Sequence, residues 1–329
     1  MHFLFDLKMC LVRSCEELRA QLFQIHRSVC SHSILLSGGL DSSILASLLK
    51  PHYAVTIGFG KAEDFTFADA IANEFCKIHI KVLLDHEMLL SIISNLIGLL
   101  KTFDPIEIRN SSVLYAGIEE SKRRGYSCVI TGDGCDELFA GYNYMRRLDG
   151  ALNDLEVELH RIWQIMHFSA QQIGKALGVT IWSPYLDNPF LEYAKRIDIS
   201  EKVGYYRGKR WGKFILRKCF EKELGKSTAW RPKQAQERGA NISLIANVIN
   251  QVCDDERFKL EREKAMGEGV VIKDKEHLYY YLLYRRKFPA PRMDNEYYKL
   301  RCPKCQCPFI WEGNYCRTCG SHPVSPYPI

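Results

Sequence analysis

A short glycine turn between an apolar strand and a helix constrains this 329-residue chain more than any other feature. The run from Ile34 to Ser43 reads ILLSGGLDSS: apolar residues, a Ser-Gly-Gly turn, then an acid and two hydroxyls that open a helix. Glycines let the backbone approach an anion closely, and a helix N-terminus directs free N–H groups at it. The pattern therefore predicts a phosphate-binding loop. It differs from the G-x-x-x-x-G-K-[ST] loop because no lysine follows the glycines.

The side chains of this loop fit the same prediction. Ser37, Ser42 and Ser43 offer hydroxyl hydrogen bonds, and Asp41 offers a carboxylate that can hold magnesium against phosphates. Ser-Gly-Gly alone also occurs in ordinary turns, but the strand before it and the amphipathic helix after it favour phosphate binding.

Composition narrows the class of protein. The length suits two domains, and 47% hydrophobic with 26% charged residues is typical of a globular chain. No apolar run is long enough to span a membrane, and the N-terminal MHFLFDLKMC is too short and polar for a secretory signal. We therefore expect a cytoplasmic protein with no membrane partner. The net charge of +6 permits contact with nucleic acid without requiring it.

The 13 cysteines fall into two groups. Four lie near the C-terminus at metal-ligand spacing, and the other nine are scattered. For a cytoplasmic chain, reduced thiols are expected in the scattered group in preference to a disulfide framework.

Strands and helices alternate through the first 150 residues. Predicted strands cover 33–36, 54–59, 79–84 and 128–131, and predicted helices cover 14–30, 44–49, 67–76, 88–100 and 113–124. The alternation predicts an α/β fold: a mainly parallel sheet with helices on both faces. Ligands bind such sheets at the carboxyl ends of the strands, so the Ser-Gly-Gly, Gly-Phe-Gly and Gly-Asp-Gly turns there should form one site.

The second half is predicted to be helical. Helices are expected at 152–167, 170–177, 189–196, 211–223, 241–253 and 274–287. The predicted organisation is a domain over 1–289, with its sheet core at about 30–150 and its helical part at 151–289, then a linker over 290–300 and a small module over 301–329.

A second glycine-rich signature, TGDGCDELFAGY, covers 131–142. It places three acids within five residues. Such crowding of carboxylates is costly unless a cation or a basic partner lies nearby. The alternative is an exposed acidic loop with no function.

Together the two signatures resemble the pyrophosphate-loop (PP-loop) ATP pyrophosphatases, and within them the synthetase domain of glutamine-hydrolysing asparagine synthetases and their β-lactam-forming relatives. Further segments match the family in the same order: Leu177-Gly178-Val179, Ser183-Pro184-Tyr185-Leu186-Asp187, Trp230-Arg231-Pro232-Lys233-Gln234, and Lys275-Glu276 with Phe288-Pro289. The resemblance extends from about residue 15 to 289. It implies the same fold and cleavage of ATP to AMP and pyrophosphate.

The resemblance also implies roles for individual residues. The ATP-binding set would be Leu35, Ser37, Gly38, Gly39, Asp41, Ser42, Ile57 and Gly132. Asp41 and Asp136 would bind Mg²⁺. The catalytic set would be Asp133, which handles the attacking amine, Lys233, which neutralises charge on the α-phosphate, and Arg109, near the phosphates.

Several positions depart from the family. The family's usual glutaminase domain is not expected before this one, since only about 30 residues precede the first strand and no nucleophilic cysteine follows Met1; ammonia is therefore expected from a separate source. Asp133 replaces a glutamate and is one methylene shorter. Ser169 lies near the expected Asp-Arg pair, and Trp182 replaces an arginine. These positions shape the amino acid pocket, so aspartate is not implied as the substrate.

The C-terminal module carries two C-x₂-C pairs, Cys302/Cys305 and Cys316/Cys319. Two such knuckles joined by a hairpin are typical of a zinc ribbon, in which bound metal supplies the folding energy. Cys307 is predicted to be a bystander. His322 would be a ligand only if one cysteine were displaced.

These features predict an AMP-forming ligase that adenylates a carboxylate and passes it to ammonia or an amine, with ATP, Mg²⁺ and Zn²⁺ as cofactors. An alternative is a tRNA- or nucleobase-modifying enzyme that replaces a base oxygen with sulfur or nitrogen, with Trp311 and Tyr315 stacking on bases. A third reading is a non-enzymatic descendant. The expected partners are a small-molecule substrate or tRNA, and a separate ammonia or sulfur donor protein.

Overall fold

The computed structural model describes residues 14–24, 32–147, 152–291, 300–309 and 313–328. The chain divides into two compact units. The first unit comprises Met1–Ile57, Glu63–Val82 and Gly117–Gln234, and the second comprises Gly58–Ala62, Leu83–Ala116 and Ala235–Ile329. The end of the predicted N-terminal helix (25–30), most of the predicted linker (292–299) and Trp311 lie outside the described residues.

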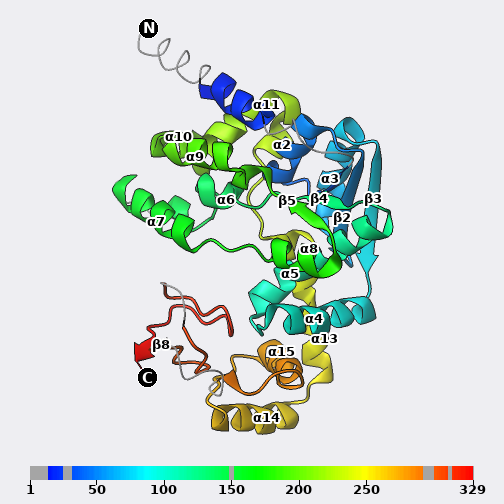
Figure 1. The fold of residues 1–329 in the computed structure, drawn as a ribbon, viewed down its shortest axis with the longest axis vertical. Coiled ribbons are helices and arrows are strands. Elements are labelled where there is room, and N and C mark those ends of the chain that lie inside the picture. The colour runs from blue at the N-terminus through cyan, green and yellow to red at the C-terminus, as the bar shows by residue number, and fades with distance from the viewer. Residues whose placement is uncertain (1–13, 25–31, 148–151, 292–299, 310–312, 329) are drawn as a thin grey trace. The chain divides into compact units, whose positions relative to one another are not determined.

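A five-stranded sheet has the order β3-β2-β1-β4-β5 (Figure 1). Its strands are β1 (Ser33–Leu35), β2 (Tyr53–Phe59), β3 (Ile78–Leu84), β4 (Cys128–Ile130) and β5 (Thr180–Trp182). The pairs β1–β2, β1–β4 and β4–β5 are parallel, with Leu35 opposite Val55 and Ile130 opposite Trp182. β2 is buried along its whole length, as expected of a strand inside a parallel sheet. The predicted α/β class is confirmed.

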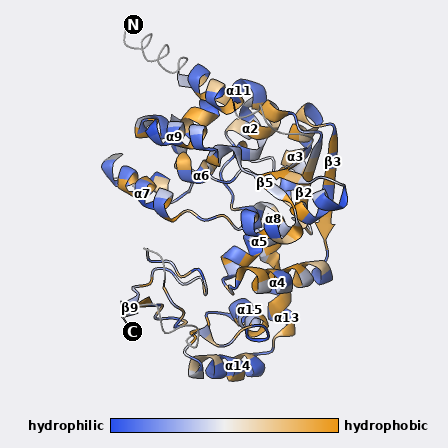
Figure 2. Ribbon diagram, in the orientation of Figure 1, coloured by the Kyte–Doolittle hydropathy of each residue, from blue (hydrophilic) through white to orange (hydrophobic). Residues whose placement is uncertain are grey.

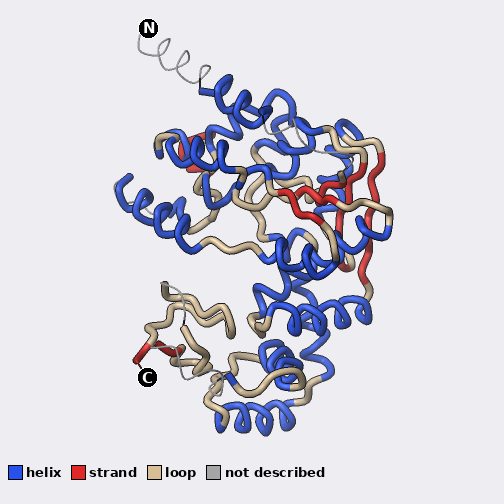
Figure 3. Tube along the Cα trace, in the orientation of Figure 1, coloured by secondary structure: helices blue, strands red, loops and turns tan. Residues whose placement is uncertain are grey.

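The helical elements alternate with the strands of this sheet along the chain and make up most of its second half (Figure 3). Besides a helix over 14–24, they are α2 (Leu40–Leu49), α3 (Glu63–Phe75), α4 (His86–Leu100), α5 (Pro105–Arg123), α6 (Cys135–Leu138), η2 (Met145–Arg147), α7 (Leu152–Ile165), α8 (Ser169–Leu177), η3 (Pro184–Leu186), α9 (Asn188–Arg196), α10 (Ile199–Lys202), α11 (Phe214–Ala229), α12 (Gln236–Gly239), η4 (Ile242–Leu244), α13 (Ile245–Val252), α14 (Asp255–Gly267) and α15 (Lys275–Arg285). Two short sheets add β6 (Val203–Tyr206) with β7 (Lys209–Gly212), and β8 (Leu300–Arg301) with β9 (Tyr327–Pro328).

The core of the first unit joins elements that are distant in sequence. Ile44 of α2, Phe190 of α9 and Phe220 of α11 are fully buried in one apolar cluster, together with Leu18 of the N-terminal helix. These contacts place α11 beside α2, whose first turn follows the glycine loop. The packing therefore fixes the loop that carries the predicted phosphate site.

Some elements differ from the sequence prediction. α5 begins at Pro105 and not at 113, because Asp104 Oδ1 accepts a hydrogen bond from the Ile106 amide and proline is well suited to the first position of a helix. The helix predicted to begin at 211 begins at Phe214, because residues 211 and 212 belong to the strand β7 (Lys209–Gly212). α14 was not predicted because its sequence is largely hydrophilic, in contrast to the apolar α13 (Figure 2).

The C-terminal segment packs within the second unit, against the turn between α4 and α5. The Phe103 amide donates to the Thr318 carbonyl oxygen (2.9 Å), and the Val271 amide donates to the Lys304 carbonyl oxygen (2.7 Å). Thr102 Oγ1 donates to the Arg317 carbonyl oxygen at 2.7 Å. The Tyr315 hydroxyl donates to the Asp104 carboxylate. The segment is therefore tied to residues 103 and 271 by backbone hydrogen bonds, and to residues 102 and 104 by bonds that involve side chains.

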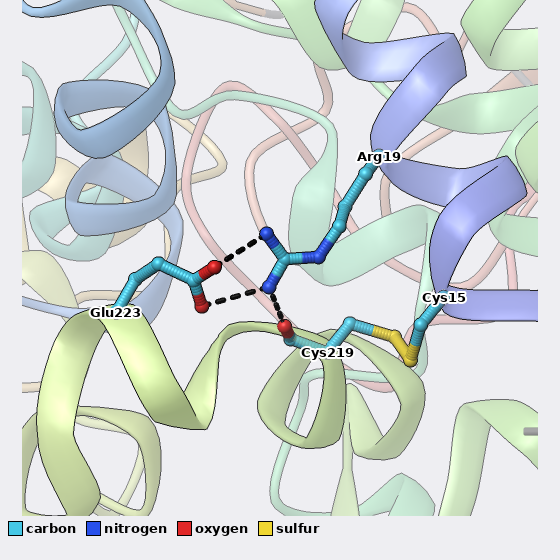
Figure 4. The surroundings of a disulfide bond; sticks show 4 residues. All are labelled: Cys15, Arg19, Cys219 and Glu223. Atoms are coloured by element: carbon cyan, nitrogen blue, oxygen red, sulfur yellow. Dashed lines mark hydrogen bonds and ion pairs between the residues drawn. A yellow bond between two sulfur atoms is a disulfide. The ribbon is translucent and has the colours of Figure 1, made fainter. Parts of the chain in front are cut away.

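A disulfide joins Cys15 to Cys219, which are 204 residues apart in sequence (Figure 4). Beside it, Arg19 contacts Glu223 at 2.5 Å and donates to the Cys219 carbonyl oxygen. The expectation of reduced thiols is wrong for this pair. Folding brings the two Cα atoms to 5.2 Å, within the range that a disulfide bridges, and sequence spacing carries no sign of this.

Among the described helices, none is by itself both long and apolar enough to cross a membrane. α4 and α5 are long and apolar enough to span a membrane only when taken together, and the chain bends by 110° at the break between them.

Candidate functional site

Two carboxylates and two lysines form one cluster in the first unit. Lys213 Nζ lies 2.6 Å from Asp41 Oδ2 and 2.7 Å from Asp136 Oδ1. Lys233 Nζ lies 3.1 Å from Asp136 Oδ2. The structure thus brings together three residues that the sequence assigned to one site, Asp41, Asp136 and Lys233. It adds a fourth, Lys213, which no motif had indicated.

The glycine loop holds Asp41 at the start of α2. Gly38 has φ +63°, and a Cβ there would lie 2.3 Å from the Phe67 carbonyl carbon, so only glycine fits. The Gly39 amide donates to Ser37 Oγ at 3.2 Å, and the Ser37 amide donates to Ser42 Oγ at 3.3 Å. These hydroxyls bind the loop's own backbone, which shapes the turn that was predicted to receive phosphate.

Asp136 lies in the short helix α6, and its surroundings hold it ionised. Burial alone would raise its pKa, but the charges of Lys213 and Lys233 outweigh burial and lower the pKa to about 2. Gly141 makes room for this group, since a Cβ there would lie 2.0 Å from Asp136 Oδ1 and 2.3 Å from Lys213 Cε. The crowded acids therefore have basic partners, and the alternative of an exposed acidic loop is wrong for Asp136.

Lys213 is the buried centre of the cluster, with only 2% of its side chain exposed. It follows β7 with φ +55° and precedes the first residue of α11. Burial would lower its pKa, but the adjacent Asp136 and Asp41 carboxylates raise it above its ordinary value. The lysine is therefore charged and neutralises two acids at once. Sequence spacing gave no signal for it, because its position depends on the β6–β7 hairpin.

The cluster suits a magnesium ion. Asp136 Oδ1 is buried and, although it is in ion-pair contact with Lys213, it receives no hydrogen bond of acceptable geometry, so it retains a lone pair. Carboxylate oxygens are the ligands that Mg²⁺ prefers in proteins, together with phosphate oxygens. Asp41 and Asp136 would hold it.

Asp133 lies beyond the end of β4 and accepts a hydrogen bond from the Thr131 hydroxyl. Thr131 Oγ1 donates to Asp133 Oδ2 at 2.8 Å and lies 2.9 Å from Ser183 Oγ, just after β5. Both hydroxyl residues are buried. The carboxylate therefore has a fixed direction, and its catalytic role stays a prediction.

The remaining predicted residues fall in two places. Leu35 and Ile57 lie on the adjacent strands β1 and β2, and Gly132 follows β4, with its missing Cβ 3.2 Å from Asp41 Cβ. Their contact with adenosine stays a prediction. Arg109 belongs to the second unit, where its Nη1 lies 3.4 Å from Glu276 Oε2. Its role near phosphate is likewise a prediction that no contact here supports.

The four cysteines of the two C-x₂-C pairs form a buried cluster with all Sγ atoms within 4.8 Å of one another. Cys302 and Cys319 Sγ are 3.9 Å apart, and Cys305 and Cys316 Sγ are 3.7 Å apart. Tetrahedral Zn–S bonds of about 2.3 Å place sulfurs about 3.8 Å apart, so the geometry fits zinc. Cys307 lies outside the cluster and accepts a hydrogen bond from Thr318 Oγ1.

A glycine loop after a parallel strand, with paired carboxylates and lysines beside it, defines an α/β protein of the pyrophosphate-loop class. A family model described as asparagine synthase matches residues 24–177 and 153–278. The chain belongs to this family, and the resemblance inferred from its motifs is confirmed.

Individual relatives agree with this assignment. A probable glutamine-hydrolysing asparagine synthetase of Dictyostelium discoideum is 31% identical over 70% of this chain and 47% of its own length. Asparagine synthetase B of Escherichia coli (strain K12) is 28% identical over 79% of this chain and 50% of its own. The chain thus spans about half the length of the curated relatives it matches.

Among solved structures, the predicted subunit of a tRNA methyltransferase from Methanocaldococcus jannaschii DSM aligns with a TM-score of 0.29 and 18% identity, covering 63% of this chain and 95% of that one. A likeness of this size supports no functional argument.

Proposed function

We propose that this chain is an ATP-dependent, AMP-forming ligase that adenylates a carboxylate and transfers the acyl group to ammonia or an amine. The cluster of Asp41, Asp136, Lys213 and Lys233 beside the glycine loop carries the proposal. Membership of the asparagine synthase family supports it. The proposal places the activity in the cytoplasm, with a small-molecule carboxylate as substrate.

In the first step, a substrate carboxylate oxygen attacks the α-phosphorus of ATP, and the bond from that phosphorus to the α–β bridging oxygen breaks. Pyrophosphate leaves into the loop formed by Ser37, Gly39 and Ser42. Asp41 and Asp136 would hold Mg²⁺, which would neutralise the negative charge of the phosphates. Lys233, with 26% of its side chain exposed, is free to move from Asp136 toward the charge that builds on the α-phosphate.

In the second step, the amine nitrogen attacks the acyl carbon and AMP leaves. Asp133, held by Thr131, would accept the proton that the amine loses. Its side chain is one methylene shorter than the family's glutamate, so the acyl adenylate or the amine must approach this carboxylate more closely.

A pyrophosphate-release screen tests the function directly. Amino acids, other carboxylates and bulk tRNA are offered with ATP, Mg²⁺ and ammonia. Pyrophosphate and AMP with a carboxylate support the ligase, whereas release only with tRNA supports the nucleobase-modifying alternative. ADP and phosphate as products would contradict both.

Replacing Lys233 with alanine should lower turnover about a hundredfold, because a charge that acts mainly in the transition state affects rate more than affinity. Binding of ATP should change little. The measurement is pyrophosphate release at saturating ATP, with nucleotide affinity measured separately. Lys222→Ala, at an exposed lysine of α11, is the matched control. Near-normal turnover of Lys233→Ala would show that this lysine takes no part in the reaction.

We further propose that one zinc ion is bound by Cys302, Cys305, Cys316 and Cys319 and has a structural role. The fit of the sulfur cluster to tetrahedral geometry supports this. Tyr315, an alternative stacking residue for tRNA bases, instead has its hydroxyl engaged with Asp104.

Chelation should therefore release one zinc and speed amide exchange at Phe103 and Val271, which donate to carbonyls of the cysteine-rich segment. The Leu36 amide, which donates to the Val55 carbonyl oxygen within the sheet, is the internal control and should exchange as before. Unchanged exchange at Phe103 and Val271 after complete zinc removal would show that the metal does not hold this segment.

A further inference from the structure

A buried ion pair lies next to Lys233, in a position for which the reaction gives no role. Arg231 Nη2 lies 2.9 Å from Asp64 Oδ1, and each side chain is only 7% exposed. Arg231 Nη1 also donates to the Ser37 carbonyl oxygen at 3.1 Å, and its Cζ atom lies 3.7 Å from the centre of the Phe67 ring. One guanidinium therefore joins three segments: the lysine-bearing loop (residues 230–235, between α11 and α12, which carries Lys233), the glycine loop and the first turns of α3.

The lysine-bearing loop is attached to α3 on both sides of Lys233. Arg231 binds Asp64, and Gln234 Nε2 donates to Glu63 Oε2 at 2.9 Å. Between these attachments, the Lys233 carbonyl oxygen accepts from Asn143 Nδ2 at 3.4 Å. The backbone that carries Lys233 is thus held in place, while its side chain remains partly exposed and able to move.

The chemistry of this contact depends on arginine. A planar guanidinium presents several donors in fixed directions and stacks on an aromatic ring, whereas an ammonium is a single point charge. Arg231 uses two nitrogens for acceptors on different elements while it covers Phe67. Lysine cannot reproduce all three contacts at once.

Stability alone is a weak reason for such a pair. The cost of removing both charges from water offsets much of their attraction, so a buried pair contributes little compared with an apolar pair of similar volume. What the pair does supply is a fixed distance between the loop of Lys233 and the loop of Ser37.

We infer that Arg231 and Asp64 are a positioning pair that holds Lys233 at the distance from the glycine loop that the reaction needs. The inference rests on the proposed function, since it assigns the pair an effect on adenylation. Neither side chain is required to touch ATP. A displacement of about 1 Å in such a group costs on the order of a hundredfold in rate.

The test is a double-mutant cycle with pyrophosphate release as the readout. Asp64→Ala and Arg231→Lys should each lower kcat about tenfold to a hundredfold in the wild-type background. In a Lys233→Ala background, Asp64→Ala should cost no more than about twofold, because a residue that acts through Lys233 has nothing left to position. An equal loss in both backgrounds would overturn the inference.

Matched controls separate positioning from loss of charge. Asp69→Ala removes another α3 carboxylate, one that pairs with Lys81 at 2.8 Å on the surface, and should leave kcat unchanged. Arg123→Lys repeats the conservative exchange at an exposed arginine paired with Glu120. If Asp64→Ala does not fold, Asp64→Asn provides the same comparison with the side-chain shape retained.

A second readout does not depend on activity. Amide exchange over residues 229–234 should increase in Asp64→Ala and stay as in wild type in Asp69→Ala. If wild type releases no pyrophosphate, the proposed function fails, and the exchange result still decides whether the pair holds the loop. Unchanged exchange in Asp64→Ala would overturn the inference in either case.

Discussion

Asp136→Asn should lower pyrophosphate release on the order of a thousandfold while the protein remains folded, by analogy with the loss of one preorganised electrostatic group in an active site. Asparagine keeps the shape of the side chain but removes the charge that pairs with Lys213 and Lys233. It also removes one of two carboxylates that would hold Mg²⁺. The measurement is initial rate at saturating ATP and Mg²⁺, with circular dichroism to establish folding.

The matched control for this variant is Asp154→Asn, at an exposed acid on α7. Its rate should equal that of wild type. If Asp136→Asn keeps more than about a tenth of the wild-type rate, Asp136 is not a ligand of the reacting complex and the site must be reassigned.

Lys213→Met should destabilise the first unit by about 3–5 kcal/mol, because it leaves the Asp41 and Asp136 carboxylates close together without their shared cation. Methionine retains most of the buried volume, so loss of charge is the main change. Urea unfolding followed by circular dichroism measures the free energy. Lys222→Met on the surface of α11 should change it by less than about 0.5 kcal/mol.

A second substitution shows whether charge is the cause. Asp41→Asn in the Lys213→Met background removes one uncompensated carboxylate, so it should recover part of the lost free energy of unfolding. A double variant that is less stable than Lys213→Met would mean that packing of the lysine stem, and not charge balance, accounts for the loss.

The site residues that sequence reasoning identified were those fixed by local motifs. Asp41 follows its glycines by two positions, and Asp136 follows a second pair of glycines, Gly132 and Gly134, so each could be assigned without knowledge of the fold. Lys233 could be assigned because it follows a Trp-Arg-Pro run that matches the family. The sheet was predictable for the same kind of reason, since its apolar strands alternate with helices.

The residues that were missed depend on contacts between distant segments. Lys213 reaches the site only because the β6–β7 hairpin ends beside α6, where the Lys213 amide donates to the Phe139 carbonyl oxygen at 2.7 Å. Thr131 and Ser183 meet only because β4 and β5 are paired. The strand β5 itself was missed because it has only three residues and, unlike β1 and β4, is not followed by a glycine-rich turn.

The bond between Cys15 and Cys219 turns most of the first unit, and the parts of the second unit inserted into it, into a covalent ring. A protease that cuts once between these two positions opens the ring but releases no fragment. Such a nicked chain would migrate as one species in a denaturing gel without reductant and as two with it. Mapping of exposed loops by limited proteolysis therefore has to include reduction, or a single cut inside the ring will be overlooked.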